Sequence, residues 1–199
     1  MIVISARAHL RELGISMGFS AALPDAACAG NRRFPYVLCL HDYGCNGETL
    51  LQSLCCASVV DKAGVALLLP NGQNGCFMNM AHGPQWETYL LQGLLPFAQR
   101  TFPLRGKPGL FGAGTGGWAA ARLAGRYPDR FAASVAAGAW EDVPGRYKAG
   151  ECGVMPDLEA VFGDPQTMPA FALCPDTRRF SDPAEALRAI LNVDWSASA

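Results

Sequence analysis

A glycine-rich turn lies near the middle of the chain, in the segment Leu110–Trp118 with the sequence LFGAGTGGW. It follows a short apolar run and precedes an alanine-rich stretch, as expected where a strand turns sharply into a helix. In many hydrolases such a turn carries the nucleophile at the centre of a G-x-S-x-G pattern, flanked by glycines because the backbone passes close to its neighbours. Here the flanking residues are Gly112 and Gly116, and the centre is Gly114, which has no side chain that could attack an acyl carbon. Glycine-rich strand-to-helix turns also bind phosphate groups, so the turn alone leaves both interpretations open.

A nucleophilic hydroxyl also needs a base to take its proton, and a histidine usually serves. The chain has three histidines, His9, His41 and His82, and all of them precede the turn. In hydrolases with this turn the order along the chain is nucleophile, then acid, then histidine. No histidine of this chain therefore stands where that order requires one. Thr115, one residue past the centre of the turn, has no evident base and is interpreted as the start of a helix.

Two histidines and two cysteines offer a different chemistry. His41, Cys45, Cys76 and His82 fall in two loops that should follow neighbouring strands, and two thiolates with two imidazoles can hold Zn²⁺. The two segments span five and seven residues, unlike the tight pairs of structural zinc sites, so a zinc- or thiol-binding module remains an alternative rather than the first choice. Cys45 alone would be a candidate reactive thiol only beside a basic group. We therefore expect no metal and no cofactor.

Composition narrows the class of protein. Half of the 199 residues are hydrophobic and 17% are charged, which is typical of a folded globular chain. The formal net charge is −1 and there is no run of Lys or Arg, so neither nucleic acid nor a membrane surface is an expected partner. No secretory leader and no apolar run of membrane-spanning length are evident, which predicts a cytoplasmic protein with reduced, mostly buried cysteines.

Strand-like and helix-like segments alternate along the chain, which predicts a mainly parallel sheet with helices on both faces. The first two strands should form an antiparallel hairpin. The expected strands are 3–9, 15–23, 36–40, 65–69, 107–111, 131–136 and 170–174. The expected helices are 48–62, 86–100, 117–126 and 182–191. A loop-rich stretch separates the last two strands.

Several motifs occur in an order that resembles the esterase family of tributyrin esterase and S-formylglutathione hydrolase (esterase D). The segment 37–46, VLCLHDYGCN, is similar to that family's buried strand and the oxyanion loop after it. Further matching pieces are FMNMAHG at 77–83, ETY at 87–89, Phe102-Pro103 and VFGD at 161–164. The resemblance extends from residue 1 to about residue 192. It implies an α/β-hydrolase fold in one domain, 1–199, whose C-terminal strand and helix are missing or incomplete.

The same resemblance places the family's site residues on this chain. The nucleophile position is Gly114, and the acid position falls near Arg178, or at Asp176 in a shifted register. The family's histidine would follow the region 192–195. Backbone N–H groups of Tyr43 and Thr115 are the expected remnant of the oxyanion hole.

Asp42 stands where the family has glycine, and so adds a negative charge where an oxyanion would form. His41 should hold its loop by hydrogen bonding, as this histidine does in the family. Trp86, Tyr89 and Trp118 are expected to be core aromatics.

We therefore expect an esterase-family homologue that has lost its catalytic triad and acts by binding. Its expected partners are a small acyl-type ligand, a second copy of the chain or an active paralogue. The alternative from the enzyme class is an ester or acyl-thioester hydrolase with an unorthodox nucleophile, or with a triad completed by another chain.

Overall fold

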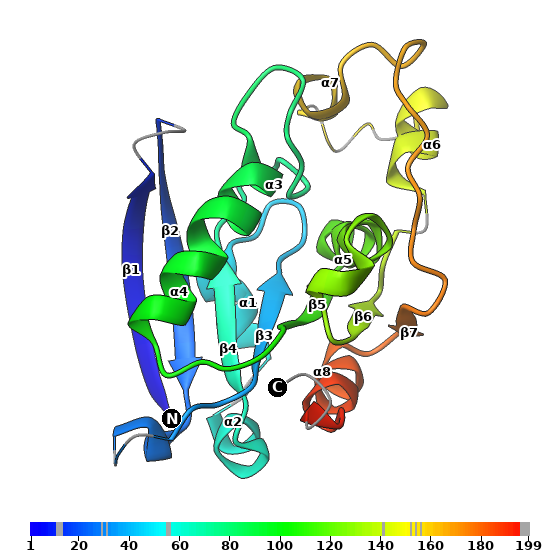
Figure 1. The fold of residues 1–199 in the computed structure, drawn as a ribbon. Coiled ribbons are helices and arrows are strands. Elements are labelled where there is room, and N and C mark those ends of the chain that lie inside the picture. The colour runs from blue at the N-terminus through cyan, green and yellow to red at the C-terminus, as the bar shows by residue number, and fades with distance from the viewer. Residues whose placement is uncertain are drawn as a thin grey trace.

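A computed structural model describes residues 1–10, 14–28, 30, 32–54, 57–140, 142–151, 153, 155 and 157–195. Its centre is a seven-stranded sheet in the order β1-β2-β4-β3-β5-β6-β7 (Figure 1). The strands are β1 (Ile2–Leu10), β2 (Ile15–Leu23), β3 (Tyr36–Leu40), β4 (Ala66–Pro70), β5 (Gly109–Ala113), β6 (Ser134–Ala137) and β7 (Arg178–Phe180). The predicted α/β fold with a mainly parallel sheet is confirmed.

The N-terminal hairpin forms one edge of the sheet. β1 pairs antiparallel with β2, from Ile2 opposite Leu23 to Leu10 opposite Ile15, and β2 pairs antiparallel with β4. All other pairs are parallel. Every residue of β3 and β4 is buried, as expected for strands covered on both faces. The predicted break in the hairpin at residues 13 and 14 lies partly outside the described residues.

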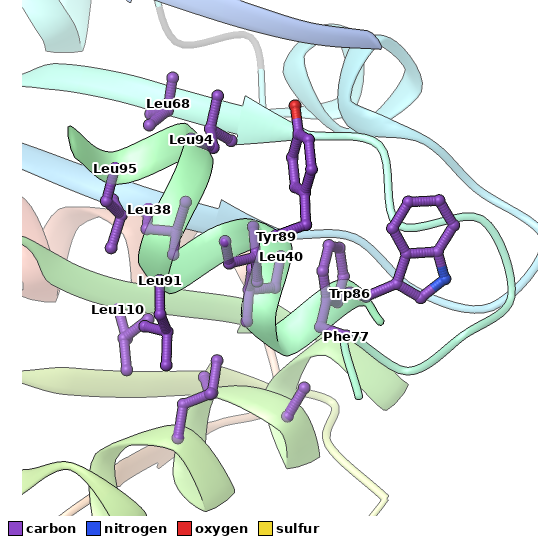
Figure 2. Packing of buried hydrophobic residues seen from close by; sticks show 14 of the residues in the cluster. Leu38, Leu40, Leu68, Phe77, Trp86, Tyr89, Leu91, Leu94, Leu95 and Leu110 are labelled. Carbon is purple, nitrogen blue, oxygen red and sulfur yellow. The ribbon is translucent and has the colours of Figure 1, made fainter. Parts of the chain in front are cut away.

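Helices cover both faces of the sheet (Figure 1). One core layer lies under the turn η3 and the helices α4 and α5, and Figure 2 shows Leu91, Leu94 and Leu95 pointing onto leucines of the strands. The other core layer lies under α1, α2 and α8. The helices are α1 (Gly47–Ser53), α2 (Ala57–Ala63), α3 (Trp86–Thr88), α4 (Leu95–Thr101), α5 (Thr115–Arg126), α6 (Val143–Lys148), α7 (Leu158–Phe162) and α8 (Pro183–Leu191). Short turns are η2 (Asp25–Cys28), η4 (Pro128–Arg130) and the π-helical η3 (Tyr89–Leu94).

Two predicted helices differ in detail from the structure. The expected helix 48–62 is two helices, α1 and α2, and the Cys55-Cys56 pair between them lies outside the described residues. The expected helix 86–100 is continuous but passes through the π-helical turn η3. Helices α6 and α7 lie in the stretch that was expected to be loop.

The predicted strand 170–174 is wrong. This segment runs along α5 instead: the Cys174 N–H donates to the Ala121 carbonyl, and Gly125 lets the two backbones approach, because a Cβ there would touch Cys174. The last strand is β7, four residues further on. At this edge of the described sheet, Arg178 and Arg179 are exposed and Phe180 is partly buried, so the strand lacks the continuous apolar run that predicts a buried strand.

The expectations about the three aromatic residues hold, but the one about the cysteines does not. Trp86, Tyr89 and Trp118 are buried, as predicted. Of the cysteines described, Cys39 and Cys76 are buried, whereas Cys28 and Cys45 are exposed and Cys174 is intermediate. The expectation of mostly buried thiols is therefore wrong for the described part of the chain. Among the described residues, no helix has the length and apolar character that a bilayer crossing requires.

Candidate functional site

The glycine-rich turn joins β5 to α5 at the carboxyl end of the sheet. Gly114 lies at its centre with φ 53° and ψ −121°, a backbone conformation that residues other than glycine rarely adopt. A Cβ on Gly112 would strike the Gly116 carbonyl, and a Cβ on Gly116 would strike the Leu40 carbonyl in β3. Both flanking glycines are therefore required by close packing, and the turn has the shape of a nucleophile elbow.

The carboxylate of Asp42 occupies the space beside Gly114. Its Oδ1 accepts the backbone N–H groups of Tyr43 and Thr115, each at 2.7 Å, and the Thr115 hydroxyl at 3.2 Å. A Cβ on Gly114 would overlap the carboxylate carbon and both carboxylate oxygens. The two N–H groups expected as the oxyanion-hole remnant thus converge on one oxygen, and that oxygen belongs to the chain itself.

His41, just before Asp42, is buried and bonded at both ring nitrogens. Its Nδ1 lies 2.7 Å from the Asp42 carbonyl and must donate, while Nε2 accepts the Gly72 N–H at 3.0 Å. These partners fix the neutral tautomer with the proton on Nδ1. Burial lowers the pKa of His41 more than its contacts with Asp42 raise it. With both ring nitrogens hydrogen-bonded, His41 holds the loop that contains Asp42.

A second layer of polar contacts covers Tyr43. The Tyr43 hydroxyl donates to Asp157 Oδ2 at 2.9 Å, and Asn74 Nδ2 donates to the same oxygen at 2.7 Å. The Gly44 N–H in turn donates to Asn74 Oδ1 at 2.9 Å. The hydrogen bonds from Asn74 and Tyr43 lower the pKa of Asp157. Asp157 and Asn74 were not identified from the sequence, because they lie far apart in the chain and belong to no motif that names them.

A buried ion pair anchors the segment after β4 to α5. Arg122 bonds to Glu87 and also donates to the Phe77 carbonyl at 3.0 Å, and the Tyr127 hydroxyl donates to Glu87 at 2.6 Å. Burial would raise the pKa of Glu87, but the charge of Arg122 and the hydrogen bonds from Tyr127 and Arg122 outweigh it, so the pKa is lowered. The Phe77 ring lies 4.9 Å from the His41 ring, centre to centre. The Glu87–Arg122 pair thereby holds the segment that carries Phe77, against which His41 packs.

The positions predicted for the acid lie at the opposite end of the sheet from Gly114. Arg178 opens β7 and pairs with Val135, while Asp176 precedes it, so both lie at the amino end of the parallel strands. Gly114 follows the carboxyl end of β5. Asp182 follows the carboxyl end of β7, where its side chain accepts the Ala184 N–H and caps α8. The sheet topology therefore does not place the two residues that were matched to the family's acid, Arg178 and Asp176, beside Gly114.

The alternative zinc site is not formed. In the part of the chain that is described, no three His, Cys, Asp or Glu side chains are grouped so that they could hold a metal ion. Cys76 is buried, Cys45 is exposed, and both nitrogens of His41 are used within the loop. The structure does not bring these residues and His82 together.

Comparison with known proteins identifies the family. A family model described as "Putative esterase" matches residues 11–149, which is more than half of the chain. The chain belongs to this esterase family. The match includes the oxyanion loop around Asp42 and the turn at Gly114. A comparison with curated proteins finds no match.

Solved structures of esterase-family and related hydrolases share the fold. FphF, a fluorophosphonate-binding serine hydrolase of Staphylococcus aureus, is 21% identical with a TM-score of 0.73 over 82% of this chain and 66% of its own. The S-formylglutathione hydrolase FrmB of the same organism is 20% identical, with a TM-score of 0.65 over 82% and 69%. An IroE-like serine hydrolase from Shewanella oneidensis is 14% identical, with a TM-score of 0.63 over 96% and 79%. This chain spans just under two thirds of FphF, and at these identities the likeness concerns the fold.

Proposed function

We propose that this esterase-family homologue has no hydrolase activity of its own and acts by binding. The observation that carries the proposal is the Asp42 carboxylate. It fills the space that a side chain at position 114 would need, and it takes both N–H donors that would otherwise stabilise an oxyanion. An ester carbonyl therefore has neither a nucleophile nor a vacant donor pair to meet at this turn.

The electrostatics of the turn work in the same direction. Acyl transfer builds negative charge on the carbonyl oxygen, and donors arranged for that charge are usually the largest single contribution to catalysis. At this turn a fixed carboxylate already stands at the donors, so a second negative charge would be repelled rather than stabilised. The remaining candidate base, His41, is held between the Asp42 carbonyl and the Gly72 N–H.

The second candidate function is hydrolysis by an unorthodox nucleophile. One contact favours it: the Thr115 hydroxyl donates to Asp42, a carboxylate that could take its proton. Against it, the same oxygen accepts two backbone N–H groups, and Thr115 is 2% exposed. Such a mechanism would also lack an oxyanion hole, because the Tyr43 and Thr115 N–H groups already donate to Asp42, which would be the base.

Ester turnover tests the two readings. The purified full chain is incubated with p-nitrophenyl acetate and butyrate beside Thr115→Val, which keeps the shape of the side chain and removes the hydroxyl. We expect the two proteins to release p-nitrophenol no faster than buffer. Turnover by the wild type that scales with protein and disappears in Thr115→Val would overturn the proposal in favour of the threonine hydrolase.

A further inference from the structure

We propose that the chain binds a small α-amino acid with an aliphatic side chain in a pocket at the amino ends of β6 and β7. The pocket has a volume of about 350 Å³, within the usual range for small-molecule sites. Because Gly114 lies at the carboxyl end of β5, the pocket is separate from the esterase-type turn. The inference therefore does not depend on whether that turn is catalytic.

The inner wall of the pocket is mainly apolar. Phe131, Ala124 and Val135 of β6 are buried, and Val193 after α8 also lines the pocket. Branched and aromatic side chains of this kind favour an apolar group on the ligand. The space suits a short aliphatic chain.

A buried hydroxyl also lines the pocket. Ser134, the first residue of β6, is 8% exposed, and its Oγ has no hydrogen-bond partner among the described residues. Buried hydroxyl groups in folded proteins nearly always have a partner. A polar atom of a ligand in the pocket would supply one.

Two side chains of opposite charge also line the pocket. Asp176 lies in the turn before β7 and Arg178 is the first residue of β7. Both side chains are exposed and line the pocket, whereas Thr177 between them is 6% exposed. The Arg178 guanidinium carbon lies 5.3 Å from the centre of the Phe180 ring, which restricts its position.

This pair of charges selects the class of ligand. A simple carboxylate would meet Arg178 but be repelled by Asp176, and a simple amine would meet Asp176 but be repelled by Arg178. A zwitterion satisfies both, with its carboxylate toward Arg178 and its ammonium toward Asp176. Together with the apolar wall, these charges indicate an amino acid such as leucine.

Calorimetric titration of the full chain with L-leucine tests the proposal. We expect saturable binding of one leucine per chain, weakened at least about tenfold by Arg178→Gln and by Asp176→Asn. 4-Methylpentanoate, which is leucine without the ammonium group, and isoamylamine, which is leucine without the carboxylate, should bind at least about tenfold more weakly than leucine. The matched control is Arg188→Gln on α8, an exposed arginine outside the pocket, which should leave the leucine affinity unchanged.

Ser134→Ala adds a readout that separates the pocket from a structural role of the hydroxyl. The variant removes an unpartnered buried group, so we expect a higher Tm without ligand and a lower affinity for leucine. No binding of leucine up to about 10 mM, equal binding of 4-methylpentanoate, or unchanged affinity in Arg178→Gln and Asp176→Asn would each overturn the proposal. A lower Tm of ligand-free Ser134→Ala would also overturn it, because the hydroxyl would then be satisfied within the protein.

Discussion

The carboxylate of Asp42 lies where a side chain on Gly114 would have to lie. The two residues are 72 positions apart, yet each explains the other. Without a side chain at position 114 there is room for the carboxylate, and with the carboxylate in place two backbone N–H groups that face the turn are satisfied. In this arrangement one carboxylate fills the space beside the turn and accepts both N–H groups.

Gly114→Ser should therefore lower stability without creating activity. The positive φ costs about 1–3 kcal/mol for a residue with a Cβ, and the new Cβ must also displace Asp42. Urea denaturation measures the loss. In the Asp42→Gly background the same substitution should be less destabilising, because the steric conflict is gone. Gly114→Ser as stable as the wild type, or an equal loss of unfolding free energy in the wild-type and Asp42→Gly backgrounds, would contradict the coupling of positions 42 and 114.

Asp42→Ala should destabilise the chain and create an anion site. It leaves the Tyr43 and Thr115 N–H groups unpaired, at a cost of about 1–3 kcal/mol. Acetate should then raise the Tm of this variant more than chloride does at equal ionic strength. Asp42→Asn, which keeps an acceptor oxygen, is the matched control and should show no such response. An acetate response equal in the wild type and in Asp42→Ala would show that the anion acts elsewhere.

The sequence predicted the sheet and the close-packed glycine turn, because each rests on local signals. Buried strands are continuous apolar runs, as at Tyr36–Leu40, and an elbow needs its close-packed glycines. It also predicted the negative charge of Asp42 at the oxyanion position. It missed β7, because Arg178–Phe180 has no continuous apolar pattern. The acid positions taken from the resemblance, Arg178 and Asp176, lie at the amino end of the parallel strands, away from Gly114. The contacts of Asp157 with Tyr43 and Asn74 depend on how loops pack together, and loops have no periodic sequence pattern that would predict this.

His41 should make stability decline as the pH falls below about 6.5. Its folded-state pKa is lowered by burial, whereas an unfolded histidine has a pKa of about 6.5. The unfolded state therefore takes up the proton first as the pH falls. Stability from this residue is complete above about pH 6.5 and declines below it, by at most about 1.4 kcal/mol per pH unit.

Urea denaturation between pH 8 and pH 5 measures this decline. His41→Asn should flatten it, while His82→Gln, at an exposed loop position, controls for the loss of a histidine. Glu87 does not interfere in this range: its pKa is lowered in the folded protein, so its contribution is lost only below its ordinary value of 4.5. A slope unchanged in His41→Asn would contradict the assignment.

Arg122→Met should be the most destabilising single change among these. It leaves Glu87 buried without its main charged partner, which typically costs about 3–5 kcal/mol. Arg126→Met is the matched control: Arg126 also contacts Glu87, at 3.3 Å, but is 61% exposed, so its loss should cost less than about 1 kcal/mol. Equal losses in the two variants, measured by urea denaturation, would mean that burial of the pair does not govern its contribution.

The most direct test of the central claim is the intact mass of the wild-type chain after incubation with a fluorophosphonate. FphF, a fluorophosphonate-binding hydrolase, serves as the positive control in the same experiment. With Asp42 at the turn and no hydroxyl on Gly114, the chain should keep its unmodified mass while FphF gains one phosphonyl group. A phosphonyl adduct on this chain, mapped to Thr115 or to any other residue at the turn, would contradict the account.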